Sequence, residues 1–206
     1  MTFVEMEEEV YIMTNRRALV AETRQSLISA ARHYHAAENW GNDSVEATVA
    51  ISPEAYAFVL DKDTEFPLLR VFNWIRKWDA SGVDPFTGLA SGAAGLYFIN
   101  KDAGTLTDGY GLEIANVYYE LGTNVRFISN TSMATIRVSY QVWPTLYPYT
   151  NFNSWFMTKF PELLIVNAAL RIAIANSDSS KIKSYSALDM QNHIDALASF
   201  MTLASK

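Results

Sequence analysis

The amino-acid sequence predicts an α+β protein in which an α-helical bundle core carries an inserted antiparallel β-sheet domain. Apolar residues recur at helical spacing towards both ends of the chain, and they alternate with polar residues at strand spacing in the middle. Turn-forming residues separate the two patterns. We therefore predict an acidic N-terminal arm over 1–13, a helical core over 14–42 and 150–206, and a β-rich insertion over 43–149.

The N-terminal part predicts the arm and one amphipathic helix. The arm contains Glu7, Glu8 and Glu9 among apolar residues, and its pattern fits either a helix or an extended chain. From about Asn15 to Glu38, apolar and polar residues fall on opposite sides of a 3.6-residue period. Asparagine and glycine residues directly after this run end the predicted helix.

The middle of the chain predicts strands. Apolar and polar residues alternate over 45–51, and the segment 66–78 is apolar on both faces, which is typical of a strand covered on both sides. The glycine-rich segment 81–111 predicts a long loop with one short strand near 96–99. The clearest pattern is an antiparallel meander over 117–142, interrupted by two polar turns.

Two helices complete the chain. The first has Pro161 in its opening turn and is apolar on nearly every side over 163–175, interrupted only by Asn167 and Arg171. Such a helix is either buried centrally or shared with a neighbouring subunit. The second begins near Ser186, and a narrow apolar stripe predicts that it covers the bundle from outside. This stripe consists of Met190, Ile194, Leu197 and Met201.

Composition excludes several classes of protein. The chain has 206 residues, half of them apolar and 18% charged, which predicts a globular protein of one or two domains. The absence of cysteine excludes disulfides, thiolate zinc sites and cysteine nucleophiles. A net charge of −6 argues against a protein that binds nucleic acid by neutralising its phosphates. Contact with DNA across a surface that repels it stays open. No apolar run reaches the length of a membrane span, and we expect no membrane partner.

Motifs for catalysis or cofactor binding are weak. His33 and His35 are two residues apart on a predicted helix, so they point in opposite directions and cannot share a metal ion. The glycine-rich run at 88–95 lacks the Lys-Ser/Thr ending of a phosphate-binding loop. The sequence contains no Gly-x-Ser-x-Gly elbow. We therefore predict no cofactor, no metal and no catalytic residue, and we expect the protein not to be an enzyme.

Aromatic side chains supply the candidate interfaces. Some of them lie in the β region, where exposed rings stack sugars or form an interface, and others crowd the entry to the apolar helix. A monomer of this size has limited volume to bury both that helix and the rings at its entry, which predicts subunit contacts. With the acidic arm and the two polar interruptions of the helix, the candidate interface residues are Glu7, Glu8, Glu9, Trp74, Trp78, Trp143, Phe152, Trp155, Phe156, Phe160, Asn167 and Arg171.

The C-terminal segment 151–199 resembles the C-terminal half of head-to-tail adaptor (connector) proteins of short-tailed bacteriophages. In that family a Trp precedes a Pro-Glu-Leu-Leu step into an alanine-rich helix, and a second helix follows an acidic turn. Segments 117–146, 44–52 and 66–79 resemble the family's strands, so the resemblance covers about 14–200. The acidic arm and the glycine-rich loop depart from the family pattern. The matching residues of the helix entry are Trp155, Pro161, Glu162, Leu163, Leu164, Ala168 and Ala169.

The resemblance implies a structural virion protein at the head–tail junction, assembled in the host cytoplasm. It implies a homo-oligomeric ring, expected to be dodecameric, that binds the portal protein and a tail nozzle or tail tube protein. DNA would pass through its channel without specific binding, and the negative net charge suits that passage. Segments 15–38 and 154–204 would build the ring wall, and the β insertion would bind the next tail component. The arm or the glycine-rich loop 82–111 would order only on docking.

Two other functions stay open at this stage. One is a virion module that binds a carbohydrate or a receptor through the exposed rings of Trp74, Trp78 and Trp143. The other is an enzyme with an unfamiliar site, for which a deep pocket with several buried titratable groups would be the telling observation. Both alternative functions would be weakened if these tryptophans were fully buried within one subunit.

Overall fold

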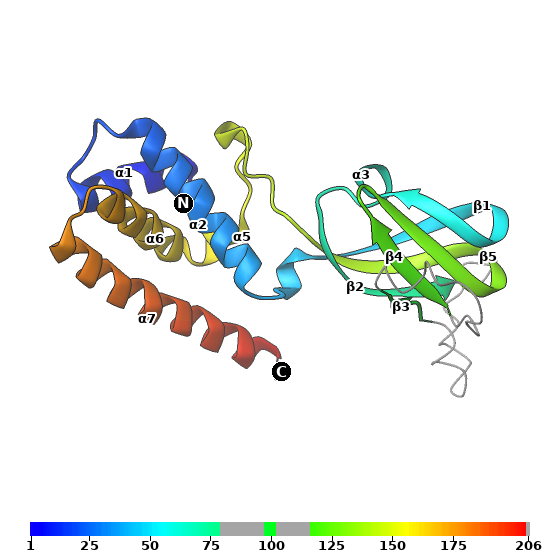
Figure 1. Cartoon of the computed structure of the whole chain (residues 1–206). Coiled ribbons are helices and arrows are strands. Elements are labelled where there is room, and N and C mark those ends of the chain that lie inside the picture. Colours follow the sequence, from blue (N-terminus) through cyan, green and yellow to red (C-terminus); the bar gives the residue numbers. More distant parts are fainter. Residues whose placement is uncertain (79–96, 102–115, 205–206) are drawn as a thin grey trace. The chain divides into compact units, whose positions relative to one another are not determined.

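The computed structural model describes residues 1–78, 97–101 and 116–204, and these form two compact units (Figure 1). Unit 1 comprises Met1–Asn42 and Pro144–Lys206, and unit 2 comprises Asp43–Trp143. Each unit has a hydrophobic core of its own. We describe the two units separately.

The predicted fold class is wrong. The chain is a mixed α+β fold, not a helical-bundle core with an inserted antiparallel sheet. The strands bury their own apolar faces against one another, so they form a unit with its own core and need no bundle to cover them. The sheet is also not purely antiparallel, because its shortest strand pairs in parallel with its neighbour.

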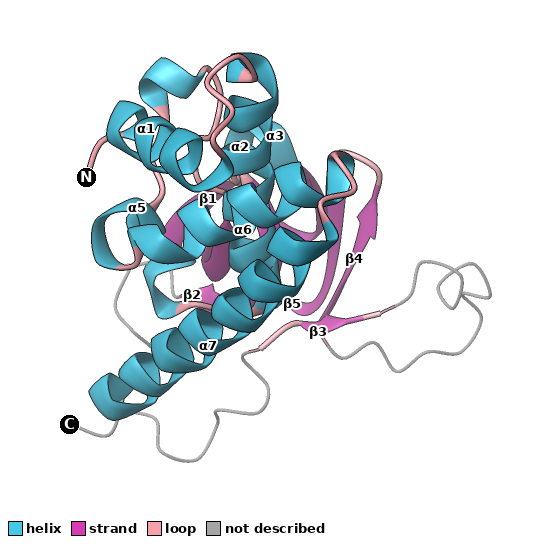
Figure 2. Ribbon diagram, turned by 90° about the vertical axis from the view of Figure 1, so that its left-hand side faces the viewer, coloured by secondary structure: helices cyan, strands magenta, loops and turns pink. Residues whose placement is uncertain are grey.

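Unit 1 consists of helices around one central helix. Its elements are α1 (Phe3–Thr14), α2 (Val20–Ala37), the 3₁₀ turn η3 (Tyr149–Asn151), α5 (Trp155–Lys159), α6 (Pro161–Ala175) and α7 (Ser179–Ala204). Helix α6 packs against α1, α2 and α7, and it lies between α1 and α7 (Figure 2). Nine of its residues are buried, so the first of the two alternatives predicted for this apolar helix holds: it is buried centrally within one chain.

Helix α2 confirms the predicted amphipathic helix but begins later than expected. Asn15 adopts a left-handed conformation (φ 56°) that ends α1, and α2 starts only after the turn that follows. The predicted apolar side is buried, including Leu27, Ala30, Ala31 and Tyr34.

Helix α7 differs from the prediction in both its start and its buried face. Asp178 accepts hydrogen bonds from the hydroxyl of Ser180 (2.8 Å) and the backbone amide of Lys181 (3.3 Å), so the helix begins at Ser179 and not near Ser186. The predicted stripe faces the core only in part: Leu197 packs against it, but Met190 and Ile194 are exposed, and the side chain of Met201 lies outside the described residues. Asp189 faces α2 and α6 instead.

Unit 2 is built around one long strand. Its elements are β1 (Ser44–Asp61), the short helix α3 (Lys62–Glu65), β2 (Leu69–Trp78), β3 (Ile99–Asn100), β4 (Val117–Leu121) and β5 (Asn124–Val142), and the 3₁₀ turn η1 (Gly41–Asp43) precedes it. Strand β5 pairs with β1 on one side and with β4 and then β2 on the other. Because Phe98 bonds to Ile75 (N to O 2.9 Å) and β3 pairs with β4, the pairing runs from β5 through β2, β3 and β4 back to β5.

The strand predictions hold in part. The β4–β5 hairpin is present, and Gly122 occupies its turn with φ 57°, where a side chain would be strained. The second predicted turn is absent, because β5 runs unbroken through 129–132. β1 likewise continues past Pro53, and a register shift between Ala50 and Ala55 takes up the irregularity. Most of the predicted loop 81–111 lies outside the described residues, which include β3 near the predicted short strand.

Candidate functional site

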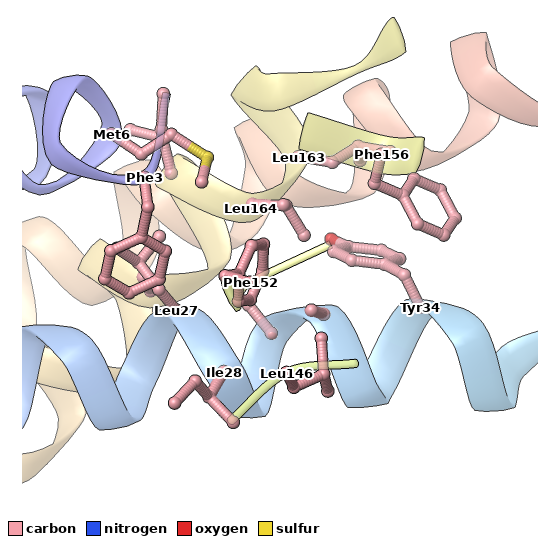
Figure 3. Packing of buried hydrophobic residues seen from close by; sticks show 14 of the residues in the cluster. Phe3, Met6, Leu27, Ile28, Tyr34, Leu146, Phe152, Phe156, Leu163 and Leu164 are labelled. Atoms are coloured by element: carbon pink, nitrogen blue, oxygen red, sulfur yellow. The ribbon is translucent and has the colours of Figure 1, made fainter. Parts of the chain in front are cut away.

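The predicted acidic arm is helix α1, and its inner face belongs to the core of unit 1. Thr2 and Glu5 form a reciprocal capping box that starts the helix. Phe3 and Met6 are buried in one hydrophobic cluster with residues of α2 and α6 (Figure 3), and Val10 belongs to the same cluster. The hypothesis that this segment orders only on docking is therefore wrong, because an apolar face that packs on its own core needs no partner to fold.

The three predicted acidic residues of this segment have different environments. Glu7 is buried and forms a two-pronged ion pair with Arg24 of α2, in which Nη2 lies 3.4 Å from Oε2. This pair raises the pKa of the Arg24 guanidinium. Glu8 is exposed and pairs with Arg17 (3.0 Å), and Glu9 is exposed. Only Glu8 and Glu9 are therefore at the surface for a partner.

The C-terminal end of α1 is capped by α7. Lys181 donates from Nζ to the carbonyl oxygen of Thr14 (2.8 Å). The hydroxyl of Tyr185 donates to the carbonyl oxygen of Met13 (2.6 Å). A cation at this position also interacts favourably with the helix dipole. Burial raises the pKa of the Tyr185 phenol, which keeps it protonated as a donor. α1 is thus fixed to α2 at its middle and to α7 at its end.

The aromatic residues at the entry to α6 fill the core of the same subunit. Phe152 and Phe156 are buried, and Trp155 and Phe160 are half-buried. Phe156 stacks on Trp155 (3.8 Å between ring centroids) and packs against Tyr34 (5.7 Å), as Figure 3 shows for the latter pair. Phe152 and Phe156 are therefore covered without a neighbouring subunit, whereas Trp155 and Phe160 keep part of their surface exposed.

The two polar interruptions of α6 belong to a hydrogen-bonded network between α2, α6 and α7. Asp189 accepts from the hydroxyl of Tyr34 (2.5 Å) and from Nδ2 of Asn167, which is 3.1 Å from each carboxylate oxygen. Arg171 donates from Nε to Oδ1 of Asn167 (2.8 Å). Burial and the adjacent Asp189 raise the pKa of the Tyr34 phenol. Asn167 and Arg171 therefore join helices within one subunit.

Two histidines border this network. The ring of Tyr34 contacts the edges of His33 (5.2 Å between centroids) and His193 (5.4 Å). Burial lowers the pKa of His33, and the nearby Arg171 adds to this effect. Nε2 of His193 is buried without a hydrogen-bond partner in the part of the chain that the structure describes. The ring contacts of Tyr34 thus join α2 to His193 of α7.

A second polar pair has the geometry of a nucleophile and its base. His35 Nε2 lies 2.9 Å from the hydroxyl of Ser154, and both residues are buried. The rings of Trp155 and Phe156 contact the imidazole edge-on. A substrate must reach a nucleophile to react with it, and Ser154 is enclosed in the core. The pair therefore serves to position the start of α5.

The tryptophans of unit 2 lie beside arginines. The Arg76 guanidinium lies over the ring of Trp74 (4.6 Å to the centroid), and Arg70 lies 5.7 Å from the centroid of Trp143. Both tryptophans are half-buried. The side chain of Trp78 lies outside the described residues. A sugar approaching Trp74 from the arginine side would have to displace the guanidinium, so this arrangement does not favour the carbohydrate-binding alternative.

Among the described residues, no cluster of three or more histidines, aspartates or glutamates has the arrangement of a metal site. Within the same residues, no helix combines the length and apolar character that crossing a membrane requires.

The outer face of α7 is the surface that the sequence did not predict. Met190 is 68% exposed and Ile194 is 49% exposed, and they lie one helical turn apart. The opposite face turns Asp189 towards α2 and α6, beside the buried Ala196 and the half-buried Leu197. Large apolar side chains on a helix of a globular protein usually face inwards, so the exposed pair is unusual. The signal in the sequence was Asp189 and His193, a polar pair at i, i+4 that shares the inward face.

No protein-family model matches the chain, and a search of curated proteins finds no match.

Proposed function

We propose that this protein is a structural virion protein, a ring-forming head-to-tail adaptor that joins the portal to the tail and continues the DNA channel. The proposal is motivated by the resemblance of 14–200 to adaptors of short-tailed bacteriophages. The residues that carry this resemblance at the helix entry, from Trp155 to Ala169, lie in α5 and α6. Leu163, Leu164, Ala168 and Ala169 are core residues, so the resemblance rests largely on packing.

The observation that carries the proposal is the exposed apolar pair Met190 and Ile194 on α7. This helix places large apolar side chains in solvent and a carboxylate against α2 and α6. Burying one Met or Ile side chain contributes about 1.5–3 kcal/mol. Exposed Met190 and Ile194 therefore provide part of the free energy for association. A subunit of a ring covers such a face with its neighbour.

The two units suit a protein that joins two others. Each unit has its own core, so each can bind a partner without rearranging the other. An adaptor has two such partners, the portal protein and a tail nozzle or tail tube protein. The net charge of −6 suits a channel through which DNA slides, because a basic lumen would bind the phosphates.

Native mass measurement with and without the portal protein tests this proposal. We expect several copies of the chain to bind each portal, in the dodecameric number that the resemblance implies. The double variant M190E/I194E should lose this assembly, because it places two carboxylates in the proposed contact. Val59→Glu is the matched control, since Val59 is exposed in unit 2. If the unaltered protein binds no portal, the adaptor function is wrong.

A further inference from the structure

Helix α1 carries a second exposed apolar stripe in unit 1. Val4 is 66% exposed and Ile12 is 64% exposed. They are just over two helical turns apart, so they share one side of the helix. Phe3, Met6 and Val10 occupy the other side and are buried. We call Val4 and Ile12 the α1 stripe, and Met190 and Ile194 the α7 stripe.

The two stripes lie on different surfaces of one subunit. α1 and α7 pack on α6, which lies between them (Figure 2). The side of each helix that contacts α6 is opposite its stripe, so the stripes face away from each other. They cannot cover one another within a subunit. A contact between different surfaces of two copies is heterologous, and such contacts close into rings when the rotation permits.

The charges around the stripes are complementary. Glu8 and Glu9 border the α1 stripe, and both are exposed. Lys183 lies two turns before Met190 on the same side of α7 and is also exposed. Because Glu8 is already paired with Arg17 (3.0 Å), the attraction between the two stripes rests on Glu9 and Lys183. The charges therefore favour contact between unlike stripes.

We propose that the α7 stripe of one copy docks on the α1 stripe of the next copy. This inference rests on the proposed ring and names the contact that builds it. Val4 and Ile12 of one subunit lie against Met190 and Ile194 of its neighbour, and Glu9 approaches Lys183. Four apolar side chains form the centre of a standard interface, whose remaining area comes from the surrounding polar surface.

Engineered cysteines test this pairing, because the chain has no cysteine of its own. The variant V4C/M190C is assembled with the portal, oxidised, and run on a denaturing gel without reductant. We expect a ladder of covalent multimers, at least ten-fold more abundant than in V4C/L188C. Leu188 is exposed two residues away but points to the other side of α7, which makes it the matched control. A mixture of the single variants V4C and M190C should stop at dimers.

The outcomes separate the pairing from the function. If native mass shows a ring but V4C/M190C gives no ladder, the pairing is wrong and the adaptor function stands. If M190C alone forms dimers efficiently, the contact is between like stripes and the pairing is also wrong. If the unaltered protein does not assemble on the portal, both are wrong. Circular dichroism of each variant checks that the fold is intact.

Charge reversal gives an independent test of the same contact. Glu9→Lys and Lys183→Glu should each reduce assembly on the portal several-fold, because each places like charges across the interface. The double variant restores the opposite-charge pair and should recover most of the loss. Additive losses in the double variant would contradict the pairing of α1 with α7.

Discussion

Replacing Met6 by Ala tests whether α1 is part of the core of unit 1. The side chain of Met6 is fully buried against α2 and α6. Truncation removes buried apolar groups, each worth about 0.8 kcal/mol, and leaves a cavity. Buried Met-to-Ala changes cost about 2–5 kcal/mol, and we expect about 3 kcal/mol for Met6. Val4→Ala is the matched control on the same helix, and its exposed position predicts a change within about 0.5 kcal/mol.

Hydrogen exchange followed by mass spectrometry measures this effect unit by unit. A loss of about 3 kcal/mol corresponds to roughly a 100-fold faster exchange of the most protected amides. We expect the change in peptides from α1, α2 and α6. Peptides from β5 serve as the internal reference, since they belong to a separate core. If Met6→Ala exchanges like Val4→Ala, α1 is an arm that contributes nothing to the core, and our account of unit 1 is wrong.

Three further changes test the polar contacts of unit 1. Tyr34→Phe removes the hydrogen bond to half-buried Asp189 and should lower the free energy of unfolding by about 1 kcal/mol in urea titration; an unchanged midpoint would contradict the network. Lys181→Met removes the cap on α1 and should cost about 0.3–1 kcal/mol, measured as a lower Tm. Because burial and Arg171 lower the pKa of His33 below its value of 6.5, the unfolded chain takes up the proton first. Stability should therefore fall as the pH drops through 6.5, and His33→Gln should flatten this dependence.

Elements with strong local patterns could be predicted from the sequence. The buried side of α2, the β4–β5 hairpin and the apolar helix α6 follow from spacing alone. Their side chains pack on whichever surface is nearest, so periodicity is sufficient to identify them.

The face of α7 could not be predicted, because long-range hydrogen bonds decide it. Asp189 bonds to Tyr34, which is far away in the chain, and this contact turns a carboxylate inwards. Hydrophobic periodicity assigns the inward face to apolar residues and so selected Met190 and Ile194. An acidic residue near the start of a helix more commonly caps that helix, so Asp189 alone gives no sign of an inward role.

The ends of the long strands also depend on distant partners. β5 continues past the polar residues 129–132 because β1 pairs along most of its length. Nothing in the local sequence encodes that pairing, and a polar run next to a strand normally predicts a turn. The same limit applies to the aromatic residues near α6. Their partners Tyr34, His35 and Trp40 come from the other end of the chain, so the volume available to bury them was underestimated.

The most direct test of the adaptor function is the native mass of the complex formed when the purified chain is mixed with the portal protein. We expect a defined species in which a ring of chains, dodecameric by the resemblance, is bound to one portal. A spectrum that contains only free portal and free chain would contradict the adaptor function. In that case the unaltered protein and M190E/I194E would give the same spectrum.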